Sequence, residues 1–151
     1  MAIKNILLTQ DAQRFEAGVV DYVLRLAKPL AAKIWVLYVV PNIDVFIGYE
    51  QGPAFIRKDL AGEMKKEHAF LQKIALEVRK SGVDAEAIVV EGEIIEGILE
   101  KAAELKADMI VCGQSDHGFL ATAFGANTGF ELLKRSEVPV LVFPIGPINP
   151  D

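Results

Sequence analysis

The 151-residue sequence contains one cysteine, Cys112, and two histidines, His68 and His117. A disulfide framework needs at least two cysteines, and a structural zinc site needs four ligands, mostly Cys or His. One chain of this protein can supply neither, so metal and redox chemistry are disfavoured. Cys112 itself belongs to an apolar run, and we expect a buried, unreactive thiol rather than a nucleophile.

Long hydrophobic runs and an excess of positive charge are also absent. No apolar stretch approaches the ~18 residues that span a membrane, and the run at 6–8 is too short for a secretory signal. The formal net charge is −5, which disfavours binding to nucleic acid or to an anionic membrane. We therefore expect a cytoplasmic protein without membrane insertion, whose partners are small molecules or proteins.

What the sequence has instead is a regular alternation of two patterns. Short apolar runs rich in β-branched residues predict strands at 6–8, 34–40, 87–90, 109–112 and 138–143. Apolar residues three or four positions apart predict helices at 15–27, 60–78, 94–105 and 130–133. This alternation is typical of a parallel sheet built from βαβ units, and the length suits a single α/β domain.

Two segments break the alternation. Residues 41–56 mix proline and glycine with the aromatic side chains of Phe46, Tyr49 and Phe55, which predicts a long loop. Exposed together, these aromatics would form a partner-binding or dimer-contact patch; folding back over the sheet is the equal alternative. Residues 145–151 include Pro147 and Pro150 and are expected to form a C-terminal tail outside the sheet.

Open parallel sheets bind ligands beyond the carboxyl ends of their strands. The segments expected at that edge are 9–11, 40–42, 91–93 and 113–127. In the last of these, Gly113, Gly118 and Gly125 precede a helix, where backbone amides can bind an anion. The sequence has neither the Gly-Lys-Ser/Thr of a P-loop nor the Gly-x-Gly-x-x-Gly of a dinucleotide site, so two common nucleotide-binding classes are excluded.

Other polar residues have structural interpretations. Glu91 and Glu93 are interpreted as a cap of the third helix, and His68 as a packed residue on the apolar stripe of the second. His117, beside Asp116, either contacts an anion or is simply hydrated at the surface. No Ser-His-Asp order or pair of carboxylates supports an enzyme.

Three stretches together resemble the universal stress protein family. They are residues 6–11, residues 91–99, and residues 107–113 followed by 138–142. The resemblance implies a Rossmann-like, adenine nucleotide alpha hydrolase-like fold over residues 1–144, with a five-stranded parallel sheet in the order 3-2-1-4-5 flanked by helices. It also implies a homodimer paired through the last strand, Val138–Phe143.

Many members of this family bind ATP through a Gly-x-x-Gly, nine-residue, Gly-Ser/Thr signature after the fourth strand. In this sequence Gly113 matches the first glycine, but Asp116 and Ala126 replace the other two and Asn127 replaces the Ser or Thr. An aspartate ~4 Å from a phosphate charge is repelled by roughly 4 kcal/mol at an effective dielectric near 20. The signature is thus degraded, although Asp11 matches the acidic residue that contacts adenosine in the family.

The resemblance leaves three functions in order of preference. The first is a non-enzymatic, homodimeric stress-response protein that regulates or shelters unknown protein partners. The second is a sensor that binds ATP or AMP, with Mg²⁺, and the third and most remote is a slow ATPase. The residues assigned to the nucleotide site are Thr9, Asp11, Val40, Gly113, Asp116, Gly118, Gly125, Ala126 and Asn127.

Overall fold

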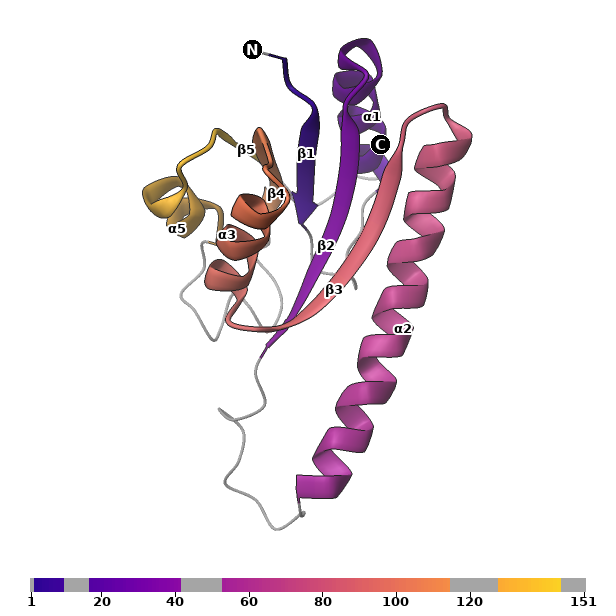
Figure 1. Cartoon of the computed structure of the whole chain (residues 1–151), viewed down its shortest axis with the longest axis vertical. Helices are drawn as coiled ribbons and strands as arrows, with labels where there is room; N and C mark the ends of the chain where they lie inside the picture. Colours follow the sequence, from indigo (N-terminus) through magenta and orange to yellow (C-terminus); the bar gives the residue numbers. More distant parts are fainter. Residues whose placement is uncertain (1, 10–16, 42–52, 115–127, 145–151) are drawn as a thin grey trace.

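The computed structural model describes residues 2–9, 17–41, 53–114 and 128–144 (Figure 1). Its elements are β1 (Asn5–Thr9), α1 (Ala17–Leu30), β2 (Lys33–Pro41), α2 (Pro53–Lys80), β3 (Ala85–Gly92), α3 (Ile94–Glu104), β4 (Met109–Gln114), α5 (Thr128–Arg135) and β5 (Val140–Pro144). The strands form one five-stranded sheet in the order β3-β2-β1-β4-β5, and every neighbouring pair is parallel. The predicted fold class and strand order are confirmed.

The central strand β1 is buried on both of its faces. Leu7 lies opposite Trp35 of β2 and opposite Ile110 of β4. Ile6, Leu7 and Leu8 have no exposed surface. A strand covered on both faces can be apolar at every position, which explains the continuous run 6–8 where a one-sided strand would alternate.

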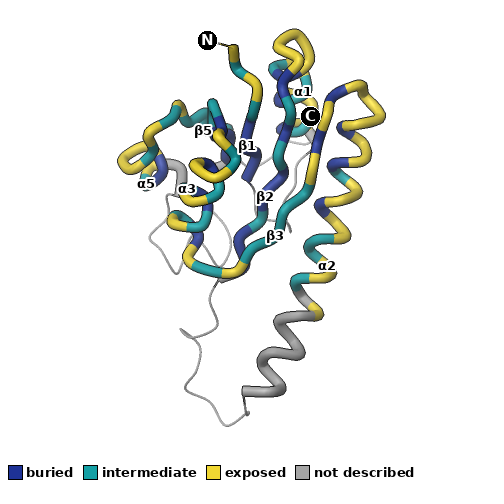
Figure 2. The backbone as a smooth tube through the Cα atoms, viewed as in Figure 1, coloured by how far each residue is buried: buried dark blue, intermediate teal, exposed yellow. Residues whose placement is uncertain are grey.

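Helices cover both faces of the sheet, as Figures 1 and 2 show. On one face, Ile6 and Leu8 pack with residues of α1 and α2 such as Val23 and Leu71. On the other face, Leu7 packs with residues of α3 and α5 such as Ile98 and Leu132. None of the described helices is long and apolar enough to cross a membrane.

The predicted loop at 41–56 is wrong at both ends. Pro41 belongs to β2, where it lies opposite Gly92, and α2 already begins at Pro53, so Phe55 is a helical residue. Proline interrupts a helix only in its interior; in the first turn its missing N–H is not needed and its fixed φ suits the helix. Phe46 and Tyr49 lie outside the described residues, so the aromatic patch stays a prediction.

The last strand is also shorter than predicted, because it begins at Val140 and not at Val138. Ser136 turns the chain before it: its hydroxyl donates to the carbonyl of Val138 at 2.7 Å and accepts from the Val138 N–H at 3.1 Å. The Pro139 carbonyl nevertheless accepts a hydrogen bond from the Ile110 N–H at 2.9 Å. Val138 thus belongs to a local turn, although its β-branched side chain suggested a strand.

Three helices end in the same hydrogen-bonded turn, with a residue at positive φ just after the C-cap. After α2 that residue is Gly82, with φ of 91°, and after α3 it is Lys106, with φ of 52°. The Lys106 N–H donates to the Ala103 carbonyl at 3.2 Å, and the Ala107 N–H to the Ala102 carbonyl at 2.8 Å. This pair of bonds is a Schellman motif, which favours glycine at the position of Lys106.

We expect Lys106→Gly to raise the free energy of unfolding by about 0.5–1 kcal/mol. A residue with a Cβ pays about 1–2 kcal/mol in this conformation, and the larger entropy of glycine in the unfolded chain offsets part of the gain. Thermal unfolding should show a rise in Tm of roughly 2–4 °C per kcal/mol. The matched control is Gly82→Ala, which meets no atom within 4 Å but should lower Tm through φ alone. An unchanged or lower Tm for Lys106→Gly would contradict this account.

Asp108 ties the start of β1 to the turn before β4. Its Oδ2 accepts hydrogen bonds from the backbone N–H of Lys4 at 2.8 Å and of Asn5 at 2.9 Å. Its own N–H donates to the Asn5 carbonyl at 2.8 Å. The two bonds to the carboxylate hold the pKa of Asp108 below its usual value, because they stabilise the ionised form.

Asp108→Asn should lower Tm at neutral pH, and the difference from wild type should shrink below about pH 4. A carboxylate with a lowered pKa stabilises the fold above its unfolded-state pKa of about 3.9, and this contribution is lost as the pH falls through the folded-state pKa. Thermal unfolding from pH 7 to pH 2.5 measures it. Asp84→Asn, at an exposed acid of the same edge, is the control. A constant Tm difference across this range would show that Asp108 does not act through its charge.

Candidate functional site

The described strands end toward one edge of the sheet. Thr9, the last described residue of β1, lies opposite Leu37 of β2 and Cys112 of β4. The description of β2 reaches Pro41 and that of β4 reaches Gln114 (Figure 1). Along the chain β1 is followed by β2 on one side, whereas β4 on its other side is followed by β5, so the strand order reverses between β1 and β4. Ligands of open α/β sheets bind at such a switch point.

Thr9 is the polar residue that the described core places toward this edge. Its exposed fraction is 7%, and it is the buried polar residue of the described core. Its register partners Leu37 and Cys112 belong to the cluster under α3 and α5, and alternation along β1 places Thr9 on that same face. Its hydroxyl forms no hydrogen bond with the described residues. Among the described residues this hydroxyl is therefore open to a polar atom of a ligand, and an unmade bond at a buried hydroxyl costs about 1–3 kcal/mol.

Val40 and Gly113 lie toward the same edge as Thr9, on the two strands beside β1. Val40 is buried near the end of β2, opposite Glu91, and Gly113 follows Cys112 in β4. The structure thus brings three of the predicted site residues to one edge. The other six, Asp11, Asp116, Gly118, Gly125, Ala126 and Asn127, lie outside the described residues, as does His117, so their roles stay predictions.

The N-terminus of α3 meets the same edge and begins after one of the two predicted cap residues. Glu93 occupies the N-cap position with φ of −73° and ψ of 137°, and its side chain makes no capping hydrogen bond. Its main-chain carbonyl accepts from the Gly97 N–H at 2.7 Å, and Glu91 lies within β3. The interpretation of these two residues as a cap of the third helix is therefore confirmed for Glu93, which occupies the N-cap position, and wrong for Glu91. Glu is not among the preferred N-cap types, which agrees with the missing side-chain bond.

Gly97 is a residue of this region that sequence reasoning missed. A Cβ built on it would lie 3.0 Å from Cγ1 and 3.2 Å from Cγ2 of Val39. Because Gly97 has no side chain, the first turn of α3 can lie directly on β2 beside Val40. The available signal was a glycine inside a helical pattern, which usually has a packing or functional reason.

Cys112 lies beside Thr9, and its thiol is buried and unreactive. Its exposed fraction is 2%, and burial raises the pKa of its thiol to about 11. Near neutral pH the thiol is protonated, and a protonated thiol is a poor nucleophile. The expectation of a buried thiol is confirmed. Among the described residues, no group of His, Cys, Asp and Glu side chains is arranged to hold a metal ion.

Comparison with curated proteins gives relatives along most of the chain. One is a universal stress protein of Methanocaldococcus jannaschii, 27% identical over 92% of this chain and 81% of its own. Another is universal stress protein C of Escherichia coli O157:H7, 26% identical over 96% of this chain and 98% of its own.

Solved structures share the fold. A universal stress protein in complex with cAMP has a TM-score of 0.66, with 20% identity over 97% of this chain and 100% of its own. The universal stress protein of Archaeoglobus fulgidus in complex with dAMP has a TM-score of 0.60, with 19% identity over 94% of this chain and 98% of its own. The model of the universal stress protein family matches residues 2–144. The chain therefore belongs to the universal stress protein family.

Proposed function

We propose that this protein is a non-enzymatic stress-response regulator that acts as a homodimer paired through β5. The observation that carries the proposal is the partial exposure of the side chains of β5, which lies at the edge of the sheet. Its side chains from Val140 to Phe143 are only half-buried, whereas Ile110, Val111 and Cys112 of the neighbouring β4 are buried. Half-buried apolar side chains on an edge that no described strand covers favour pairing with a second strand.

The hydrogen-bonding groups of β5 support the same proposal. The bond from Ile110 N–H to the Pro139 carbonyl shows that residues 139, 141 and 143 direct their backbone groups toward β4. The N–H and C=O of Val140 and Val142 therefore point away from the sheet. On the adjacent α5, Phe130 and Leu133 are 50% and 54% exposed. Pairing with a second β5 about a two-fold axis would satisfy both kinds of group.

Two substitutions test the dimer. Val142→Pro removes an outward-pointing N–H without removing a bond to β4, and Leu133→Lys places a charge on the apolar flank. Each should shift the mass from twice the 16.5-kDa chain toward that of one chain. Sedimentation velocity measures the mass, and Leu76→Lys, at a 46%-exposed leucine of α2, is the matched control. A dimer that survives both substitutions, or a wild-type monomer, would contradict the proposal.

The second candidate is an adenine-nucleotide sensor, and the buried hydroxyl of Thr9, which no described residue bonds, favours it. Thr9 lies toward the carboxyl edge, where the strand order reverses and where α/β sheets bind ligands. Family members of the same fold form complexes with cAMP and with dAMP. ATP or AMP, with Mg²⁺ for the triphosphate, is the ligand class that these observations support for this chain. Hydrolysis is not part of the proposal.

Thermal unfolding with and without ATP–Mg²⁺ or AMP tests this candidate. At ~100 times its Kd a ligand adds about 2.7 kcal/mol of stability, which corresponds to a rise in Tm of roughly 5–11 °C. Thr9→Val should keep or raise the Tm without ligand, because it removes a buried hydroxyl that no described residue bonds, and should lose most of the ligand-induced rise. Asp11→Ala tests the predicted adenosine contact separately. If neither nucleotide raises the wild-type Tm, the sensor fails and the dimer proposal is unaffected.

A further inference from the structure

β3 forms the second edge of the sheet, opposite β5, and no strand of the described chain pairs with its outer side (Figure 1). It is eight residues long and pairs with β2 in an unbroken register up to Gly92. Natural edge strands are commonly protected by short length, lysine, proline or a bulge. The sequence and register of β3 contain none of these four features. This edge can therefore accept a further strand.

Alternate residues of β3 direct their backbone groups outward. The Ile34 N–H donates to the Asp84 carbonyl at 2.9 Å, so residues 84, 86, 88 and 90 direct theirs toward β2 and residues 85, 87, 89 and 91 away from it. The Ala85 carbonyl agrees with this direction, because it accepts a hydrogen bond from Nη1 of Arg79 in α2 at 3.2 Å. The next three outward residues have no such bond with the described chain. An extended chain matches their spacing.

Apolar side chains flank this row of backbone groups on both faces of the sheet. Residues 87–90 are all apolar and half-buried. Ile88 and Val90 pack against the cluster under α3. On the other face α2 contributes Leu76, which is 46% exposed. Leu76 lies three residues before Arg79, so it is on the side of α2 that faces the edge of β3.

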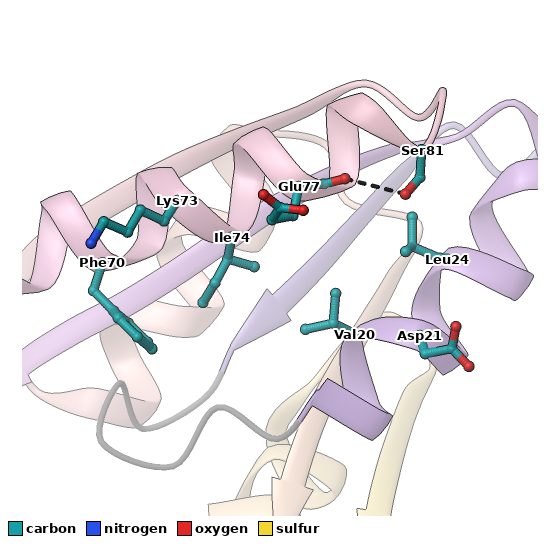
Figure 3. A pocket seen from close by; sticks show the side chains of 8 residues that line it. All are labelled: Val20, Asp21, Leu24, Phe70, Lys73, Ile74, Glu77 and Ser81. Carbon is teal, nitrogen blue, oxygen red and sulfur yellow. Dashed lines mark hydrogen bonds between the residues drawn. The ribbon is translucent and has the colours of Figure 1, made fainter.

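Figure 3 shows a different side of α2, which faces α1 across a groove of about 400 Å³. From α2, this groove is lined by Phe70, Lys73, Ile74 and Glu77. Leu76 and Arg79 are not among its lining residues. They lie instead along the edge of β3, where Arg79 reaches an outward carbonyl. Because α2 runs along this edge, the space beside β3 suits a single extended chain, whereas a second folded sheet would meet α2 (Figure 1).

The charges around this edge favour a basic chain. Lys33 pairs with both Asp84 and Glu86 at the start of β3. Glu91, at the other end, and Glu93, just beyond it, are exposed and form no ion pair with the described residues. Acids therefore outnumber cations here even when Arg79 is included. Complementary charge steers association and selects the partner.

We propose that β3 binds an extended basic segment of a partner protein, which adds to the sheet as a sixth strand. Its backbone pairs with Ala87, Val89 and Glu91, its apolar side chains contact Leu76 and Ile88, and a Lys or Arg lies beside the glutamate. In this mode of recognition main-chain hydrogen bonds supply affinity, and side chains at alternate positions supply specificity. The surface lies at the opposite edge from β5 and apart from the nucleotide site, so it depends on neither proposed function.

NMR titration of the nitrogen-15-labelled full chain with a synthetic peptide tests the proposal. The probe is acetyl-Lys-Val-Thr-Val-Thr-Val-Lys-amide. We expect saturable binding, with larger amide shifts in β3 than in β5. The same peptide with glutamate in place of both lysines should bind roughly fivefold more weakly or worse. A peptide N-methylated at its valines and threonines keeps its side chains but cannot donate to a strand, and should bind roughly tenfold more weakly or worse.

Substitutions in the protein test the same surface. Val89→Pro removes an outward N–H without removing a bond to β2, and Leu76→Lys places a cation on the apolar flank; each should weaken binding by roughly fivefold or more. Glu91→Gln should weaken it by roughly two- to fivefold, the range of an exposed ion pair, and Glu100→Gln, at an exposed acid of α3, is its control. Val142→Pro, at the other edge, should bind the peptide as wild type does. Circular dichroism identifies a misfolded variant, and Leu76→Lys, at an exposed position, keeps the test decisive if Val89→Pro fails to fold.

Several results would overturn the proposal. Absent or non-saturable binding of the lysine peptide removes the site, and equal binding of the N-methylated peptide removes strand addition. Equal binding of the glutamate peptide removes the basic partner, and shifts centred on β5 move the site to the other edge. A lower sedimentation mass for Val89→Pro, with no change for Val142→Pro, would make β3 an interface between copies of the chain.

Discussion

The structure depends on the burial of β1 on both of its faces. Ile6 and Leu8 support the layer of α1 and α2, while Leu7 supports the layer of α3 and α5. The same strand also hydrogen-bonds to β2 on one side and to β4 on the other. Both hydrophobic clusters and both halves of the sheet therefore meet in five residues. A polar or shortened side chain at any of these three positions would leave a cavity in the layer that the side chain supports.

The two edges of the sheet have different roles. At the amino edge, the Asn5 side chain accepts a hydrogen bond from the Trp35 indole at 3.0 Å, and the Asn5 N–H donates one to the Asp108 carboxylate. The Lys33 ammonium lies 3.9 Å from the centroid of the Trp35 ring and also pairs with Glu86. These contacts fix the starts of the strands. At the carboxyl edge lie Thr9 and the ends of β2 and β4, where open α/β sheets bind ligands.

The sequence predicted the fold further than it predicted the site. Periodicity identified every described strand and helix because burial on one or two faces leaves a direct pattern in the side chains. It failed where the outcome depends on backbone geometry: Pro53 starts a helix, Val138 enters a turn with Ser136, and Glu91 belongs to β3 and not to the cap of α3. The position of Thr9, Val40 and Gly113 toward one edge could be predicted because the carboxyl ends of parallel strands lie together. The close approach of Gly97 to Val39, and the lack of a partner for the Thr9 hydroxyl among the described residues, require the third dimension.

By itself the sequence determined the class of fold, the strand order implied by the family resemblance, and a charge and composition that disfavour metal, nucleic-acid and membrane functions. Those properties follow from side-chain chemistry summed along the chain. The tertiary structure alone decided that Lys73 has no ion-pair partner in the described chain while Asp21 and Glu77 do. It also decided that α1 and α2 stand apart over different strands and leave a groove between them. Separation and pairing are properties of distance between residues remote in sequence, and no local pattern encodes them.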